Sequence, residues 1–322
     1  ILNNLKKKKI EYIIMEASSH GLKQNRLDGL FFDIGIFTNL SHDHLDYHRN
    51  MKDYLKSKLY LFEKLIKKKG NIITDANIPQ SNKIKNISQK KNINLSLIFS
   101  KNKGIELISH RFLNEKQILK IRFKKKIFNL SLNLIGKIQI NNILMAILAA
   151  NKVGIKFKKI IKIIHKIKPV EGRLESIGKI KNNSKVILDY AHTPAALELA
   201  LLNIKNQFPE RKISIVFGCG GERDFKKRSM MGKIAEKYSD RIFLTDDNPR
   251  NENPNLIRRT LKKYCQKAED IPNRRKAIQT AISEMSEKDV LIIAGKGHEK
   301  YQIIKNKKII FDDFKVAKDF IK

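Results

Sequence analysis

The chain has 322 residues, of which 41% are hydrophobic and two are cysteine, and its formal net charge is +35. This length predicts about two domains, the apolar fraction excludes a disordered chain, and no apolar run reaches the roughly 18 uncharged residues of a membrane helix. The positive charge is spread along the chain as lysine among isoleucine and asparagine, a pattern typical of compositional drift, and we expect no specific nucleic-acid interface.

The first hundred residues alternate strand and helix signals. Short apolar runs bounded by polar residues predict three strands, at residues 11–15, 33–39 and 70–75. Residues 51–68 carry apolar side chains at helical spacing, which predicts an amphipathic helix before the third strand.

Residues 93–134 have a different pattern. Short strand-like runs there are separated by polar turns, which predicts a small antiparallel subregion. Helical spacing returns at 138–154 and 156–168, and Pro169 ends it because proline disfavours helix in the residue before it.

Strands alternating with helical stretches reappear after residue 170. Four apolar strands are expected at 185–191, 212–218, 241–246 and 289–295. This alternation predicts βαβ units and a mostly parallel sheet. We therefore expect one domain over 1–170 and a second over 171–322.

Polar sets follow these four strands directly, with the sequences DYAHTP, FGCGGERD, TDDNPR and AGKGHE. A fifth set, MEASSHGLKQNRLDG, follows the first predicted strand of the chain. Ligands of an open parallel sheet bind beyond the carboxyl ends of its strands, so these sets predict a binding site. One such set alone would be interpreted as a solvated turn.

Taken in order, MEASSHG, FTNLSHDHLDYH, YLKSK, EGRLE and the four later sets resemble the Mur ligases of peptidoglycan synthesis. The resemblance implies an α/β fold in which the remainder of a central ATPase domain precedes a Rossmann-like C-terminal domain. It implies an ATP-dependent acid–amino-acid ligase that adds meso-diaminopimelate to UDP-N-acetylmuramoyl-L-alanyl-D-glutamate through an acyl phosphate. With no recognisable signal peptide and two cysteines, we expect a cytoplasmic protein, and we expect a monomer that binds no membrane.

The resemblance also assigns residues to the first predicted domain. Glu16, His44 and Lys58 would hold Mg²⁺, with Lys58 carbamylated by CO₂, a reaction that requires its pKa to be lowered. An ordinary polar loop histidine is the better interpretation for His48 than for His44. Three further residues, Ser18, Gln24 and Arg26, would hold the UDP-muramyl dipeptide.

Two more ligands are assigned in the same way. The ATP residues are expected to be Asn142, Arg173, Asp189 and His192. The diaminopimelate residues are expected to be Arg223, Asp247, Asn248, Pro249, Arg250, Gly295 and Glu299. Arg250 supplies a planar fork for the distal carboxylate, and Glu299 with the Gly295 carbonyl suits the distal amine.

The 322 residues depart from the family pattern in one respect. The phosphate-binding loop G-x-x-x-x-G-K-[ST] does not occur in them, and neither does the N-terminal domain that holds the uridine nucleotide. We therefore expect a C-terminal portion of a longer ligase, with activity of these residues alone in doubt. A lysine-adding Mur ligase, a folylpolyglutamate synthase-like ligase, and an inactive relic or basic nucleic-acid-binding protein are the alternatives.

Overall fold

A computed structural model describes residues 2–41, 44–45, 47–113, 115–180, 183–222 and 224–321. The chain forms two compact units, residues 1–97 and 98–322. This division does not test the predicted domain boundary near residue 170, which stays a prediction.

The first unit is a small α/β unit. Its elements are α1 (Leu2–Lys7), α2 (Ser19–Lys23), β1 (Phe32–Phe37), α3 (Met51–Tyr60), the π-helical turn η1 (Leu61–Leu65), β2 (Ile66–Asp75), α4 (Ser81–Lys91) and β3 (Asn94–Ile98). β1 and β2 pair in parallel, and β3 lies on the other side of β2. Phe37, Phe62, Ile72 and Ile84 form its core, because helix and strand each turn one apolar face inward.

The predicted helix over 51–68 is too long. α3 ends at Tyr60, η1 follows, and residues 66–68 already belong to β2. Ile66 pairs with Phe32 of β1, so sheet hydrogen bonding overrides the helical spacing of these residues.

The predicted strand over 11–15 is wrong. Residues 10–18 form no helix or strand, and Ile14 is 98% exposed. An extended segment becomes a strand only when a neighbour completes its backbone hydrogen bonds, and no strand in the described part of the chain pairs with it.

The second unit begins with the predicted antiparallel subregion, which is confirmed. β4 (Gly104–Leu113), β5 (Lys116–Phe123) and β6 (Lys126–Leu132) pair in sequence as antiparallel strands. The two predicted helices follow as α5 (Ile138–Lys152) and α6 (Phe157–Ile163), with a 3₁₀ turn η2 (Ile164–Lys166) before Pro169.

The rest of the second unit is built on a sheet of six strands in the order β11-β10-β9-β12-β8-β7. The strands are β7 (Glu175–Lys179), β8 (Lys185–Asp189), β9 (Ile213–Phe217), β10 (Arg241–Leu244), β11 (Glu269–Asp270) and β12 (Val290–Ala294). β7 is antiparallel to β8, whereas β8, β12, β9, β10 and β11 run in parallel. The four predicted parallel strands are therefore confirmed.

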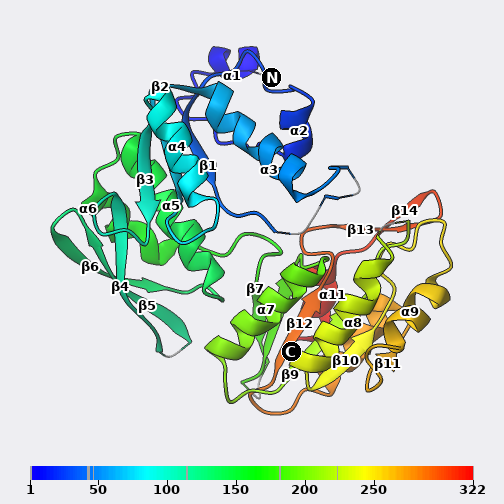
Figure 1. The fold of residues 1–322 in the computed structure, drawn as a ribbon. Helices are drawn as coiled ribbons and strands as arrows, with labels where there is room; N and C mark the ends of the chain where they lie inside the picture. Colours follow the sequence, from blue (N-terminus) through cyan, green and yellow to red (C-terminus); the bar gives the residue numbers. More distant parts are fainter. Residues whose placement is uncertain are drawn as a thin grey trace. The chain divides into compact units, whose positions relative to one another are not determined.

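Helices cover both faces of this sheet (Figure 1). α7 (Pro194–Gln207), α8 (Lys226–Tyr238) and α9 (Pro254–Lys262) pack with one face, and α10 (Arg274–Ser283) and α11 (Asp313–Phe320) pack with the other. Successive residues of β12 alternate between the faces: Ile292 belongs to the first core, and Leu291 and Ile293 belong to the second. A hairpin of β13 (Tyr301–Ile304) and β14 (Lys307–Ile310) follows β12. Among the described residues, no helix is long and apolar enough to cross a membrane.

Candidate functional site

The loops after β8, β9, β10 and β12 lie at one edge of the parallel sheet, as expected. The backbone N–H of Gly221 donates to the carbonyl of Asn248 at 2.9 Å, which joins the β9 and β10 loops. The N–H of Gly295 donates to the carbonyl of Asp189 at 3.2 Å, which joins the β12 and β8 loops. Three of the four polar sets are linked further by side chains around Asn248.

Asn248 is the centre of a buried polar cluster. Its Nδ2 donates to Glu299 Oε2 at 3.0 Å, and its Oδ1 accepts from Lys296 Nζ at 3.1 Å and from the Ile303 N–H at 2.9 Å. Lys296 Nζ lies 3.1 Å from the same oxygen of Glu299. The Asn248 amide is thus occupied by protein contacts, so it positions its neighbours.

Arg250 is held by backbone groups. Its φ is +54°, and its N–H donates to the Ile303 carbonyl at 3.0 Å, which ties the β10 loop to β13. Nη1 donates to the carbonyls of Gly221 at 2.7 Å and Asn248 at 3.4 Å. A Cβ at Gly220 would lie 2.9 Å from Nη1, so the glycine leaves room for the guanidinium. No hydrogen bond of Nε or Nη2 to a described residue is seen, which leaves that side of the planar fork for an anion.

Asp247 adds a second carboxylate beside Glu299. The residue is 7% exposed, and the structure gives its carboxylate no hydrogen bond among the described residues. Gly295, with φ of +111°, lies against it: a Cβ at this position would be 2.7 Å from Asp247 Oδ2. Pro249 precedes Arg250 in the same loop, and its carbonyl accepts from the Glu252 N–H at 3.1 Å. Arg223, the remaining residue predicted for the amino acid, lies outside the described residues.

The β8 loop carries residues predicted for ATP. The carboxylate of Asp189 accepts hydrogen bonds from the N–H groups of Leu174 at 2.7 Å and Ala191 at 2.8 Å. Burial raises the pKa of Asp189, and these two donors oppose that effect. Asp189 thereby fastens the EGRLE segment to the loop.

The other predicted ATP residues are more exposed. The Arg173 guanidinium lies 4.6 Å from the centroid of the Tyr190 ring. His192 packs edge-on against the same Tyr190 ring, with 4.5 Å between the two ring centroids, and its Nδ1 is 2.9 Å from the Tyr190 carbonyl. Asn142 is exposed on α5, and no contact of its side chain with these residues is described.

The first unit holds the residues predicted for the UDP-muramyl dipeptide. Ser18 caps α2 and accepts from the Gly21 N–H at 3.1 Å. Gln24 ends the same helix, and its Nε2 donates to the Tyr47 hydroxyl at 2.9 Å. Arg26 is exposed after the helix. The three polar groups thus lie at the two ends of the short helix α2, and residues 18–26 are called the α2 platform below.

Lys58 differs from a surface lysine. It is half-buried on α3, and its Nζ donates to the Asn39 carbonyl, at the carboxyl end of β1, at 2.6 Å. The ammonium lies 5.0 Å from the Phe37 ring centroid and 5.5 Å from that of Tyr54. Burial lowers the pKa of Lys58, which is the condition that reaction with CO₂ requires.

The predicted metal residues Glu16 and His44 are not joined to Lys58 by a described contact. Glu16 is exposed, and the His44 ring lies edge-on to those of His20 and Tyr54. No group of three or more His, Cys, Asp or Glu side chains among the described residues is placed to hold a metal.

His48 lies in the loop before α3, as predicted, but it is packed into the first unit and not an ordinary solvated residue. It is 1% exposed, stacks on Tyr54, and has Nε2 2.9 Å from Ser19 Oγ. Burial, with the nearby Lys23 ammonium, lowers the pKa of His48. Its ring therefore joins the α2 platform to α3.

Two cations of the second unit were missed by the sequence analysis. Lys296 is fully buried, and Arg274 is too. Arg274 pairs with Asp313 through Nε at 2.8 Å and Nη2 at 2.6 Å, and Nη2 also donates to the carbonyl of Ala294, the last residue of β12. Arg274 thus supports the strand end from which the AGKGHE loop departs. Its position in a pair with Asp313 carried no local sequence signal.

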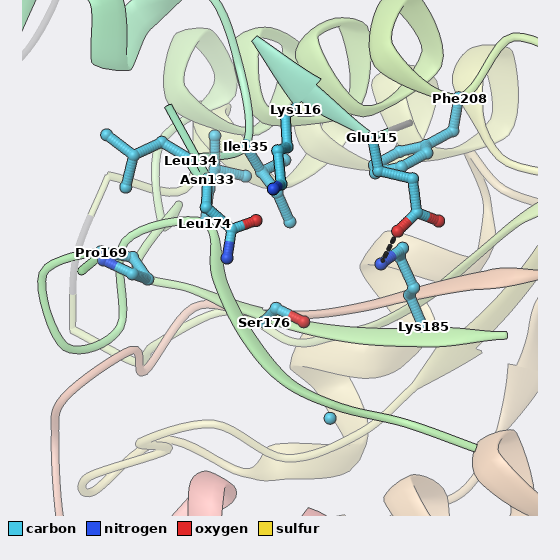
Figure 2. Close-up of a pocket in the computed structure, with 11 residues that line it drawn as sticks. Glu115, Lys116, Asn133, Leu134, Ile135, Pro169, Leu174, Ser176, Lys185 and Phe208 are labelled. Atoms are coloured by element: carbon cyan, nitrogen blue, oxygen red, sulfur yellow. Dashed lines mark ion pairs between the residues drawn. The ribbon is translucent and has the colours of Figure 1, made fainter. Parts of the chain in front are cut away.

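A cavity of about 440 Å³ lies elsewhere in the second unit and contains none of the predicted site residues. Figure 2 shows Lys116 and Asn133 on its wall and the Glu115–Lys185 ion pair, 2.8 Å long, at one end. Because Glu115 also pairs with Arg211 at 2.8 Å, this ionic cluster fastens the turn before β5 to the parallel sheet.

Comparisons with known proteins match both parts of the chain. The family model described as Mur ligase middle domain matches residues 1–150, and the one described as Mur ligase, glutamate ligase domain matches residues 172–297. A UDP-N-acetylmuramoyl-L-alanyl-D-glutamate--2,6-diaminopimelate ligase of Rickettsia rickettsii is 40% identical over 325 residues, covering 100% of this chain and 67% of its own length. The ligase of the same name from Buchnera aphidicola is 42% identical, covering 97% of this chain and 64% of its own length.

Solved structures of Mur ligases have a similar fold. A structure of a UDP-N-acetylmuramoyl-L-alanyl-D-glutamate--2,6-diaminopimelate ligase has a TM-score of 0.64 at 29% identity and covers 95% of this chain and 63% of that one. A MurF ligase from Thermotoga maritima in complex with ADP has a TM-score of 0.68 at 12% identity, which shows a shared fold. The chain thus spans about two thirds of the length of the relatives it matches.

Proposed function

This chain belongs to the Mur ligase family, and we propose that it serves in the ATP-dependent addition of meso-diaminopimelate to UDP-N-acetylmuramoyl-L-alanyl-D-glutamate. The single observation that carries the choice of amino acid is the group of Arg250, Glu299 and Asp247 around Asn248. Diaminopimelate ends in both an ammonium and a carboxylate. The carboxylates of Asp247 and Glu299 suit the ammonium, and the guanidinium of Arg250 suits the carboxylate.

The proposed reaction has two steps. A carboxylate of the dipeptide attacks the γ-phosphorus of ATP, which gives an acyl phosphate and ADP. The amine of diaminopimelate then attacks the acyl carbon, phosphate leaves, and the nitrogen loses a proton to give the amide. Both steps depend on positioning and on neutralising phosphate charge.

We propose that the described residues divide these tasks. Arg173, stacked on Tyr190, faces the nucleotide, and Asp189 fixes the segment that carries Arg173. On the first unit, Glu16, His44 and a carbamate on Lys58 would hold Mg²⁺, which would offset the negative charge of the phosphates. The lowered pKa of Lys58 supports the carbamate because only a neutral amine reacts with CO₂.

The rest of the α2 platform, Ser18, Gln24 and Arg26, would bind the UDP-muramyl dipeptide. We further propose the domain boundary near residue 170, which is supported by family matches that end at 150 and begin at 172. A cytoplasmic location and a monomeric state are part of the same proposal.

The test is a ligation assay on the full gene product with ATP, Mg²⁺ and the UDP-muramyl dipeptide. Product mass is measured separately with meso-diaminopimelate, L-lysine and L-glutamate. We expect the diaminopimelate adduct and stoichiometric ADP. Preferential use of L-lysine or L-glutamate would favour the other ligases of the family. Salt-sensitive DNA binding without any amino-acid-dependent ADP release would favour the basic-protein alternative.

A further inference from the structure

Among the described residues, Lys296 is the one lysine in the polar cluster of the amino-acid pocket. It is fully buried, and its Nζ lies 3.1 Å from Asn248 Oδ1 and 3.1 Å from Glu299 Oε2. A buried ammonium is costly unless it is paired, and here it is paired with one carboxylate oxygen. The described residues give the other oxygen, Oε1, no hydrogen bond, and the Glu299 side chain keeps 19% of its surface exposed. Glu299 therefore turns one oxygen to Lys296 and leaves the other for a ligand.

Among the described residues of this pocket, the formal charges cancel. Asp247 and Glu299 are anionic, whereas Arg250 and Lys296 are cationic. The neighbouring Arg274 is neutralised separately by Asp313, since both side chains are fully buried in a two-point ion pair. Without Lys296, these described residues would carry one net negative charge.

We propose that Lys296 is a specificity-determining residue that selects an amino acid with a zwitterionic distal end. The proposal rests on the function proposed above and deepens it. A distal end with both ammonium and carboxylate adds no net charge to a balanced pocket. A distal end with an ammonium alone, as in L-lysine, adds one uncompensated positive charge close to the Lys296 ammonium.

The repulsion acts over a short distance. An ammonium bound to Oε1 of Glu299 would be separated from Nζ by little more than the width of one carboxylate, roughly 5–6 Å. At the effective dielectric of a protein site, like charges at that separation change affinity by about ten- to a hundredfold. Removing Lys296 should relieve this repulsion and raise the affinity for L-lysine. It should also leave Glu299 less firmly held and lower the affinity for diaminopimelate. Both effects reduce the preference for diaminopimelate.

Lys296→Met is the test variant because it keeps length and removes charge. Folding should survive, since Asn248 Oδ1 retains the Ile303 N–H and Glu299 Oε2 retains the Asn248 amide. In the full gene product, kcat/KM is measured for meso-diaminopimelate and L-lysine. We expect the ratio of the two to fall by about tenfold or more, with KM for ATP unchanged. Lys300→Met is the matched control, because this nearby lysine is 60% exposed and pairs only with the exposed Glu171 among the described residues.

Glu299→Gln gives a second, independent readout. This substitution adds one positive charge to the balance of the pocket. The kcat/KM for L-lysine should therefore fall at least as much as that for diaminopimelate, and the ratio of the two values should not become smaller. A purely structural role for the cluster would move both variants in the same direction. If Lys296→Met does not fold, a narrowed ratio in Glu299→Gln overturns the inference by itself.

The outcomes separate the two proposals. A wild-type enzyme that does not prefer diaminopimelate overturns the proposed function. A wild-type enzyme with that preference, combined with a ratio within about threefold of wild type in folded Lys296→Met, overturns only the role of Lys296.

Discussion

Replacing Lys58 with alanine tests whether this lysine serves chemistry or only packing. The wild-type side chain donates one hydrogen bond to the Asn39 carbonyl and lies near the Phe37 and Tyr54 rings. Such a hydrogen bond contributes about 1 kcal/mol to stability, and the ring contacts contribute about 1 kcal/mol more. The substitution also relieves the burial of a charge. The free energy of unfolding should therefore fall by no more than about 2 kcal/mol.

The expected loss of activity is far larger than this structural effect. If a carbamate on Lys58 supports the bound metal, Lys58→Ala should lower kcat in the full gene product by about a hundredfold or more. Lys58→Arg should be equally inactive, because a guanidinium keeps the positive charge and forms no carbamate. The modification is measured directly by ¹³C NMR after equilibration with ¹³C-bicarbonate.

The pH dependence has a defined sign. Burial lowers the folded-state pKa of Lys58 below its usual value of 10.5, so the unfolded chain binds more protons between these two pKa values. The unmodified protein should thus gain stability as pH rises through the folded pKa towards 10.5, and Lys58→Ala should lose this slope. The neutral amine that reacts with CO₂ becomes more abundant over the same range.

Lys56→Ala is the matched control, since Lys56 is exposed on the same helix. Turnover in Lys58→Ala within about threefold of this control would refute the catalytic role. A carbamate signal that persists in Lys58→Ala would show that another lysine is modified.

Three further predictions concern the second unit. Arg250→Ala should cost meso-diaminopimelate about 2–5 kcal/mol of binding, roughly thirty- to several-thousand-fold, while leaving L-lysine nearly unchanged; an unchanged kcat/KM ratio would remove Arg250 from the pocket. Asp313→Asn should lower the free energy of unfolding by about 3–5 kcal/mol in urea titrations because it leaves Arg274 unpaired, whereas the exposed Asp319→Asn should cost at most about 1 kcal/mol. Gly172→Ala places a Cβ against the backbone of Gly297 and His298 at φ of +68°, so the thermal midpoint of the protein should fall by several degrees; an unchanged midpoint would contradict this packing.

The sequence predicted the parallel sheet well because the local residue pattern of each strand is enough to identify it. Residues 213–217 and 290–294 are continuous apolar runs, and each side chain is buried by a helix on one face or the other. Residues 66–69 gave no such signal, because lysines dominate them and their strand character comes from pairing with β1. Hydrogen bonding to a distant segment decides such cases, and no local pattern reports it.

The same reasoning explains which site residues were found. Arg250 and Glu299 lie in short polar sets that directly follow predicted strands, and this position identified them as candidates. Lys296 lies in the same set but could not be told apart in a chain with 67 lysines and arginines. Its burial depends on Asn248, which is 48 residues away in the sequence.

Compositional drift towards lysine affects exposed and buried cation positions differently. Exposed lysines such as Lys67 and Lys288 pair weakly with neighbours, and solvent screens their charge, so their number is little constrained. Buried ion pairs are different, because a planar fork that binds both carboxylate oxygens compensates for lost hydration better than a single ammonium does. Three arginines with side chains at most 4% exposed fill buried ion-pair positions: Arg228 and Arg274 each bind both oxygens of one carboxylate, and Arg258 bridges Asp246 and Asp270. A buried lysine in such a chain therefore calls for a reason of its own, and at Lys296 the charge balance of the pocket supplies one.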